Sequence, residues 1–82
     1  MSHYVYILRS LKDDRYYIGE SADVKARLLF HNSGKQRSTR NRIPFILVWT
    51  EEYATREEAL RREKQIKSWK GGQAFQRLIN GM

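Results

Sequence analysis

The sequence contains no cysteine, and only two histidines occur in its 82 residues. The lack of cysteine excludes a disulfide framework, a thiolate metal site and a cysteine nucleophile. Only His31 lies away from the N-terminus, so a multi-histidine metal cage is excluded too. An internal repeat, a phosphate-binding glycine loop, an HExxH pair and a Ser/His/Asp arrangement are all missing. None of these familiar motifs therefore supplies a function.

Long hydrophobic runs are also missing. No apolar run approaches the ~18 residues that a membrane span requires, and Met1-Ser2-His3 does not open a signal peptide. We therefore expect a cytoplasmic protein without a membrane partner. The length predicts a single domain, residues 1–82, with a modest core, and we expect a monomer. A hydrophobic fraction of 40% argues against disorder.

Acidic residues are scarce beside basic ones. Sixteen lysines and arginines face nine aspartates and glutamates, which gives a net charge of +7. This excess favours a polyanionic partner, most often nucleic acid. A merely basic soluble protein is the alternative. An anionic membrane surface is disfavoured, because no predicted helix combines a basic face with a broad apolar one.

Two runs rich in aromatic and β-branched residues, 4–10 and 15–19, are separated by a lysine and two aspartates. This pattern predicts a β-hairpin. In such a hairpin, residues whose numbers sum to about 23 lie opposite each other, so Tyr6 should face Tyr17 across the strands. Gly19 would allow a close backbone approach just beyond the pair. On the hairpin alone, packing explains two facing tyrosines as well as catalysis does.

Residues 24–32 have helical spacing, with good N-cap residues before them and Gly34 as a C-terminal stop. Arg27 and His31 are four residues apart and border the buried stripe of this helix. The positive charge of Arg27 should keep His31 neutral. An ordinary surface pair is the alternative interpretation.

The next eight residues carry four cations among small polar side chains and no apolar residue. We expect an exposed loop, because such a segment has nothing to bury. Its composition suits contact with phosphates, although a solvated loop without a ligand is equally consistent with it. The candidate nucleic-acid-binding residues are Lys35, Arg37, Arg40 and Arg42.

Residues 43–53 form the third predicted strand. They are apolar in both alternate positions, which predicts that both faces of this strand are covered. We therefore expect helices on each side of the sheet, and this strand at or near its centre. Pro44 lies near the start of the strand, where a missing hydrogen-bond donor is tolerated.

A second helix is predicted from a capping box, Thr55 with Glu58, to the glycines at 71 and 72, and a last short helix covers residues 73–80. Glu63 falls on the inner stripe of the second helix, where a carboxylate is costly without a cation or a metal nearby. A buried salt bridge, a metal ligand and a general base are the alternatives. The other members of the stripe are Ala59, Leu60, Ile66 and Trp69.

These pieces occur in a characteristic order: Tyr4-Val5-Tyr6, then Tyr17-Ile18-Gly19, then an arginine and a histidine four apart, then a later glutamate. The ordered set resembles the GIY-YIG nuclease domain over essentially the whole chain, in particular its small stand-alone bacterial members. The module is similar to the cleavage domains of the excision-repair nuclease UvrC and of homing endonucleases. The resemblance implies an α/β (α+β) fold, with a three-stranded antiparallel sheet flanked by helices in the order ββαβαα. It also implies phosphodiester hydrolysis with one divalent metal, Mg²⁺ or Mn²⁺.

The resemblance assigns catalytic roles to Tyr6, Tyr17, Arg27 and His31, and a metal-binding role to Glu63. Arginine can grip a phosphate through two donors, and a carboxylate is the hard ligand that Mg²⁺ accepts. We expect Tyr17 to act as the base and Tyr6 as an orienting hydroxyl. His31 would serve as a proton shuttle or as a donor to the phosphate.

Three positions depart from the family pattern. Tyr4 replaces the first glycine of the name motif, and Glu20 stands where some relatives carry lysine. Phe75 stands where some relatives carry an asparagine, and Asn80 comes too late in the chain to replace it.

The sequence thus predicts a metal-dependent DNA endonuclease in repair or processing, without a small-molecule cofactor and with RNA as an open substrate. The first alternative is a nucleic-acid-binding module that retains the fold without cleavage. The second is a protein-interaction domain whose basic surface is incidental.

Overall fold

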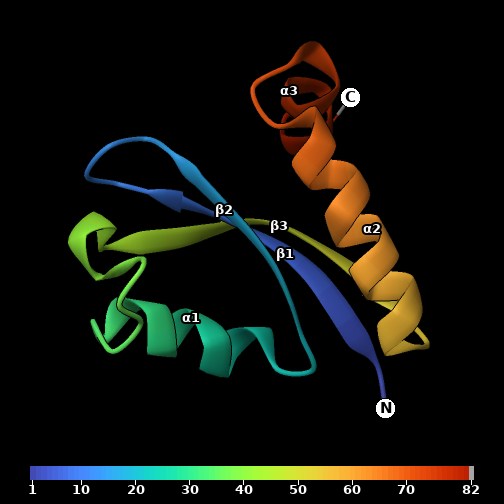
Figure 1. The fold of residues 1–82 in the computed structure, drawn as a ribbon, viewed down its shortest axis with the longest axis horizontal. Coiled ribbons are helices and arrows are strands. Elements are labelled where there is room, and N and C mark those ends of the chain that lie inside the picture. Colours follow the sequence, from blue (N-terminus) through green and yellow to red (C-terminus); the bar gives the residue numbers. More distant parts are fainter. Residues whose placement is uncertain (82) are drawn as a thin grey trace.

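The computed structural model describes residues 1–81 as two strands, a helix, a third strand and two further helices (Figure 1). The strands are β1 (His3–Ser10), β2 (Tyr16–Ser21) and β3 (Phe45–Tyr53). The helices are α1 (Val24–Asn32), α2 (Arg56–Trp69) and α3 (Gln73–Ile79), and a short 3-10 turn, η1 (Arg40–Arg42), precedes β3. The order ββαβαα and the three-stranded antiparallel sheet confirm the expected fold class. Within the described residues, no helix has both the length and the apolar character to cross a membrane.

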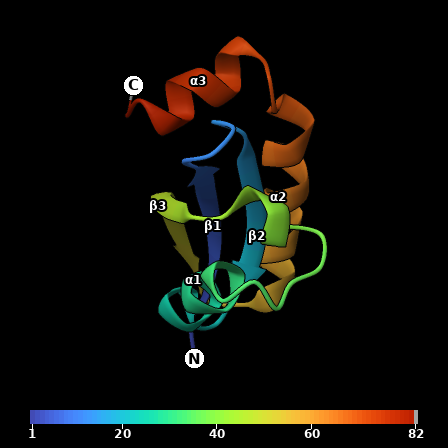
Figure 2. The ribbon, with the colours of Figure 1, turned by 90° about the vertical axis from the view of Figure 1, so that its left-hand side faces the viewer.

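The strands lie in the order β2-β1-β3, with β1 in the middle (Figure 2). The expectation that the third strand is central was therefore wrong. Val5, Ile7 and Leu8 of β1 are completely buried, whereas Ile46 and Leu47 of the edge strand β3 are exposed. An apolar run shows that a segment suits a sheet, but it does not show which neighbours the segment pairs with.

Helices cover both faces of the sheet, as expected. On one face, α2 and α3 pack against the odd-numbered residues of β1; the buried cluster there contains Val5, Ile7, Ile18, Ala59, Ile66 and Phe75. On the other face, α1 packs against the even-numbered residues; that cluster contains Tyr6, Leu8 and Phe45, with Tyr17, Val24, Leu28 and Ile43 around them. Because side chains alternate along a strand, β1 serves two different cores.

The hairpin register differs from the prediction. Tyr6 lies opposite Gly19, and Tyr17 lies opposite Leu8, so paired residue numbers sum to 25 rather than 23. The turn is centred later than expected, because Ser10 still pairs with Arg15 through a 2.8 Å backbone hydrogen bond. A shift by an even number keeps every side chain on its own face. The two tyrosines therefore still share one face, as diagonal rather than direct neighbours.

Gly19 makes room for the ring of Tyr6. A Cβ atom at position 19 would lie 2.5 Å from the Tyr6 hydroxyl oxygen. The close approach predicted at this glycine thus exists, but it is made by a side chain rather than by backbone. Glycine is required here because it is the one residue without a Cβ atom.

The two long helices begin where the sequence predicts. Asp23 accepts a hydrogen bond from the Ala26 N–H at 3.0 Å, and Thr55 accepts one from the Glu58 N–H at 3.2 Å. One member of the predicted inner stripe of α2 was wrong, because Leu60 is 40% exposed. The half-buried Arg62 lies inward instead, with its guanidinium 5.0 Å from the centre of the Trp69 ring.

Candidate active site

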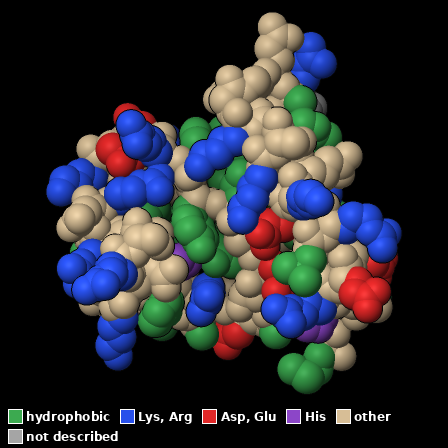
Figure 3. All heavy atoms as spheres, viewed as in Figure 1, with side chains coloured by type: hydrophobic (Ala, Val, Ile, Leu, Met, Phe, Trp, Pro, Cys, Tyr) green, Lys and Arg blue, Asp and Glu red, His purple; other side chains and the backbone are tan. Residues whose placement is uncertain are grey.

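Tyr6 and Tyr17 stand side by side on the α1 face of the sheet. Their rings stack with centroids 6.3 Å apart and an interplanar angle of 28°. Tyr6 belongs to the central strand and is 1% exposed, whereas Tyr17 belongs to the edge strand β2 and is half-buried. Figure 3 looks onto the β2 edge and shows a strip of hydrophobic side chains flanked by lysines and arginines. Of the two hydroxyls, that of Tyr17 therefore has the easier path to a ligand.

A hydrogen-bonded chain runs beneath the tyrosines. The Tyr6 hydroxyl lies 3.2 Å from His31 Nε2, and His31 Nδ1 lies 3.1 Å from Thr39 Oγ1. His31 and Thr39 are buried, so the chain joins a strand, a helix and a loop inside the protein. A neutral imidazole has one donor and one acceptor nitrogen, which matches one partner on each side.

His31 is held in its neutral form. Burial lowers the pKa of His31 below its ordinary value of 6.5, and the positive charge of Arg27 lowers it further. The expected neutral histidine thus has two causes, of which burial is the larger. The burial also means that Tyr6 and Thr39, rather than solvent, are its hydrogen-bond partners.

Tyr6 stays protonated over the physiological range. Burial raises the pKa of Tyr6 to about 12, and nearby Tyr17 and Glu63 act in the same direction, while Arg27 opposes them. A hydroxyl with so high a pKa is a hydrogen-bond donor rather than a base. This fits the orienting role expected for Tyr6.

Arg27 approaches the same cluster from α1. Its guanidinium lies 5.2 Å from the centre of the Phe30 ring, and its charge acts on both Tyr6 and His31. The side chain is otherwise exposed. The structure therefore brings together Tyr6, Tyr17 and His31, with Arg27 at the border between them and solvent.

Glu63 comes from α2, and its charge also acts on Tyr6. Its side chain is 17% exposed, and its Oε2 lies 2.8 Å from Nζ of Lys67, one helical turn further on. The ion pair foreseen as one alternative therefore exists, but its lysine is 53% exposed and the pair is not deeply buried. Such a pair in one helix stabilises the protein by about 0.3–0.5 kcal/mol.

Glu63 could bind a metal ion only as a single protein ligand. Within residues 1–81, no group of three or more His, Asp and Glu side chains could hold a metal ion. Mg²⁺, however, is commonly bound by one or two carboxylates together with water and substrate phosphates. Glu63 alone therefore suits a metal that arrives with the substrate, provided that the exposed Lys67 moves aside.

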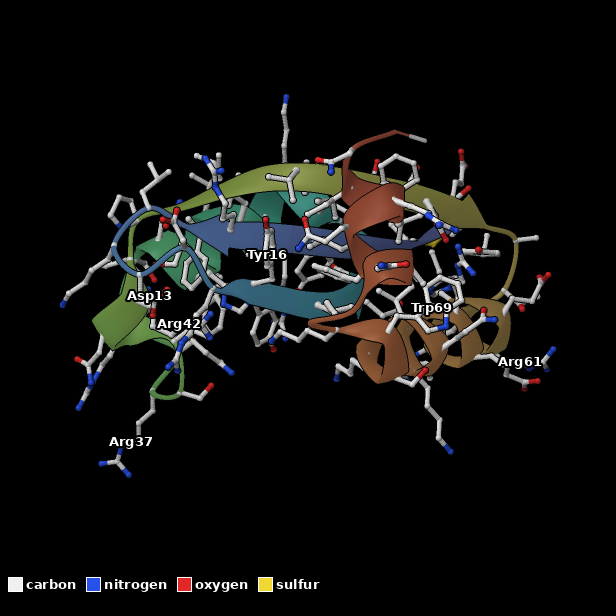
Figure 4. All side chains as sticks on the ribbon, turned by 90° about the horizontal axis from the view of Figure 1, so that it is seen from above. Asp13, Tyr16, Arg37, Arg42, Arg61 and Trp69 are labelled. Carbon is white, nitrogen blue, oxygen red and sulfur yellow. The ribbon has the colours of Figure 1, made fainter. Side chains whose placement is uncertain are left out.

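The four predicted phosphate-binding cations do not share one environment. Lys35, Arg37 and Arg40 are exposed, and Figure 4 shows Arg37 projecting away from the body of the protein. Arg42 lies inward instead, with its Nε 3.3 Å from Asp13 Oδ2 and its guanidinium 5.6 Å from the Phe45 ring centre. Arg42 thus links the loop to the hairpin turn.

The loop itself is less exposed than expected, because Thr39 is only 1% exposed. Its hydroxyl bonds to His31, and this bond anchors the loop to α1. Nothing in the sequence marks Thr39 as part of the site, because a threonine among lysines and arginines gives no signal of burial. Only the position of the loop over the helix reveals it.

Two of the positions that depart from the family pattern, Glu20 and Phe75, have defined partners in the structure. Glu20 pairs with His3 at 3.1 Å and with Arg56 at 3.4 Å. Phe75 is completely buried in the apolar core, so it stands in an apolar environment where some relatives carry an asparagine. Asn80 follows the end of α3 and makes no side-chain hydrogen bond within residues 1–81.

Comparison with known proteins places this site in context. Residues 2–76 match the family model of the GIY-YIG catalytic domain. A UPF0213 protein of Staphylococcus haemolyticus is 43% identical over 68 residues, which cover 82% of each chain. A UPF0213 protein of Staphylococcus epidermidis is 40% identical over 80 residues, which cover 96% of each chain.

A solved structure agrees with both the fold and the sequence matches. The solution NMR structure of a UPF0213 protein from Bacillus halodurans is 46% identical, with a TM-score of 0.50, and the match covers 83% of this chain and 72% of that one. Fold, motif order and sequence therefore agree that this chain belongs to the GIY-YIG domain family.

Proposed function

We propose that this protein is a divalent-metal-dependent endonuclease that hydrolyses phosphodiester bonds in DNA. One observation carries the proposal: Tyr6, bonded to the buried neutral His31, stacks on the more accessible Tyr17. Arg27 and Glu63 place opposite charges close to this pair. Membership of a nuclease domain family supports the same conclusion.

The positive charges of the protein have two proposed roles, binding of the nucleic acid and stabilisation of negative charge during the reaction. Arg27 is permanently positive and can grip two phosphate oxygens through its planar guanidinium. The net charge of +7 adds a general attraction for a nucleic-acid backbone. Attack on a phosphodiester builds negative charge on the phosphoryl oxygens, and donors aimed at those oxygens lower the barrier.

The proton transfers fall to the two tyrosines and the histidine. Tyr17, as the tyrosinate, accepts the proton of the attacking water, and Tyr6 orients that water or the phosphate as a donor. The new P–O bond forms as the bond to the leaving sugar oxygen breaks, and that oxygen takes up a proton from solvent. A tyrosine hydroxyl, with an ordinary pKa near 10, is a poor base until a neighbouring cation lowers that value. His31 relays protons through Tyr6; its burial favours this role over direct donation to a phosphate.

Glu63 would hold the metal, which the family's chemistry implies. A bound divalent ion supplies charge for the phosphoryl oxygens and acidifies water. This chain would supply a single carboxylate, and the remaining coordination positions would be left to water and phosphate.

The proposal is tested by incubating labelled single-stranded, duplex and branched DNA, and the matching RNAs, with Mg²⁺, Mn²⁺ or a chelator. We expect metal-dependent cleavage that falls at least about 100-fold in Tyr17→Phe, because the proton acceptor is lost. Tyr16→Phe is the matched control, since the neighbouring Tyr16 faces the other side of the sheet and packs against Phe75. If the protein binds nucleic acid but cleaves none of these substrates, the nuclease proposal is wrong and the protein is a non-catalytic binding module.

A further inference from the structure

A second group of cations meets at the start of the edge strand β2, around the backbone oxygen of Tyr16. Lys70 Nζ donates to the backbone oxygen of Tyr16 at 2.6 Å, and Arg42 Nη2 donates to the same oxygen at 3.3 Å. Arg15 lines the same hollow from the hairpin loop. Two cations far apart in sequence thus donate to a single neutral carbonyl, and a third cation lines the same hollow.

The three cations surround a real hollow. It lies between the hairpin loop, Arg42 and the turn that joins α2 to α3, and it is lined by Asp14, Arg15, Tyr16, Arg42, Lys70, Gly71, Phe75 and Gln76. Tyr16 and Phe75 meet edge to face, with ring centroids 5.0 Å apart. Figure 4 shows Arg42 and Asp13 beside the strand that carries Tyr16. We call this hollow the cation notch.

The positive charge of the cation notch is poorly balanced. Three cations stand against two carboxylates, because Asp13 pairs with Arg42 and Asp14 also lines the notch. Among residues 1–81, neither Arg15 nor Lys70 forms an ion pair. Burial lowers the pKa of Lys70, and the charges of Arg42, Lys67 and Arg15 lower it further. The carboxyl end of α2 favours one cation nearby, yet it does not account for three.

An anion in the cation notch would remove this imbalance. Lysine and arginine from separate segments, together with backbone groups, commonly bind phosphates of a nucleic-acid backbone. Tyr16 and Tyr17 are consecutive residues of the same edge strand, with the notch on one side and the candidate active site on the other. A strand lying across the β2 edge therefore reaches both places.

We propose that the cation notch is a second phosphate-binding site, which holds a backbone phosphate of the nucleic acid beside the scissile one. Arg15 and Lys70 bind the phosphate, and Arg42 positions it while retaining its bond to Asp13. This inference rests on the proposed function, because it assumes a nucleic-acid substrate. Inorganic phosphate shares the same chemistry, and the experiment below separates the two sources.

The first arm of the experiment measures DNA binding by fluorescence anisotropy in chelator, at several salt concentrations. The double variant Arg15→Gln/Lys70→Gln is compared with Lys12→Gln/Lys64→Gln. The control removes equal charge from exposed positions on the same hairpin loop and on α2, the helix that Lys70 caps. We expect the notch variant to flatten the salt dependence by about two units, and the control to change it by much less. If the salt dependence of DNA binding flattens equally in both double variants, the proposed phosphate site is wrong. If the double variant does not fold, Arg15→Gln alone gives the same comparison at about one unit, with Lys12→Gln as its control.

The second arm titrates inorganic phosphate into the protein at constant ionic strength and follows the amide NMR signals of Arg15, Tyr16 and Gly71. Saturable shifts in the wild type and in Tyr17→Phe, but not in the notch variant, together with the flattened salt dependence, support the proposal. Phosphate shifts without any DNA binding would mean that the notch takes free phosphate only, and the proposed nuclease would then fail independently. The absence of both effects would show that the cations are purely structural and would overturn the inference.

Discussion

The two faces of this small sheet differ in what they bury. The buried cluster on the α2 face consists of aliphatic side chains and Phe75, whereas the α1 face buries a tyrosine, a histidine and a threonine. Buried polar groups are costly unless they are hydrogen-bonded, and the Tyr6–His31–Thr39 chain satisfies them one by one. One strand, β1, thus contributes to stability through Val5 and Ile7 and to the site through Tyr6.

The adjacent tyrosines of β2 repeat this division. Tyr16 packs against Phe75 on the α2 face, while the ring of Tyr17 lies 4.6 Å from that of His31 on the α1 face. The same residue type therefore packs against the core on one side and lines the candidate active site on the other. This contrast predicts that substitutions on the two faces affect different measurements.

The largest expected effect is on catalysis. Glu63→Gln should reduce metal-dependent cleavage by at least about 100-fold, because the carboxylate proposed to hold the metal is lost. Thermal unfolding without metal should hardly change, since the pair with the exposed Lys67 contributes about 0.5 kcal/mol at most. Glu57→Gln, an exposed change on the same helix, is the control. Loss of stability with cleavage retained in the folded fraction would assign Glu63 to the salt bridge alone.

The next effect is on stability. Ile66→Ala should lower the free energy of unfolding by about 2–5 kcal/mol, because it leaves a cavity under β1. Urea denaturation measures this loss, and Leu60→Ala on the same helix should change stability by no more than about 0.5 kcal/mol, since Leu60 is exposed. A similar cost for both variants would contradict the division of α2 into a buried and an exposed side.

Gly19→Ala should lower both the stability of the protein and its cleavage activity. The new methyl group would meet the Tyr6 hydroxyl at 2.5 Å, and overpacking of this kind costs about 1–3 kcal/mol. Cleavage should fall as well, because the Tyr6 ring must move from His31. A double-mutant cycle with Tyr6→Leu checks the cause: the penalty at position 19 should shrink once the ring is absent. An unchanged penalty would place the strain elsewhere.

The basic loop should affect binding without affecting either core. Neutralising Lys35, Arg37 and Arg40 to glutamine should flatten the salt dependence of DNA binding by up to about three units, one for each phosphate contact. Arg42→Gln should add about one more unit, and it alone should also lower stability, because it breaks the pair with Asp13. Binding with an unchanged salt slope would show that the loop is only solvated.

The smallest effect concerns pH. Burial lowers the pKa of folded His31, so between that value and the ordinary 6.5 the unfolded chain takes up a proton that the folded protein does not. Stability should therefore fall as the pH drops below 6.5, by no more than about 1.4 kcal/mol per pH unit. Urea denaturation at a series of pH values from about 5 to about 8 measures this loss of stability, with His3→Gln as the background so that His31 is the histidine that titrates. Adding His31→Asn should remove the dependence of stability on pH. The same slope in both variants would mean that another group titrates.

The sequence by itself determined the local elements, because their causes are local. Side-chain alternation identified the strands, Asp23 and Thr55 marked where the two long helices begin, and glycines marked where they end. The order of the motifs was sufficient to identify the family. Even the error in hairpin register kept the tyrosines on one face, since side chains repeat every two residues along a strand.

Tertiary structure alone decided which strand is central and which residues of the predicted inner stripe of α2 are buried. It also decided which loop residue completes the hydrogen-bonded chain that begins at Tyr6. Strand order depends on pairing between segments distant in sequence, and an apolar pattern does not encode it. The contact between Thr39 and His31 and the meeting of Arg15, Arg42 and Lys70 arise for the same reason. Each joins groups from separate elements, and only their packing in space brings those groups within hydrogen-bonding distance or into one hollow.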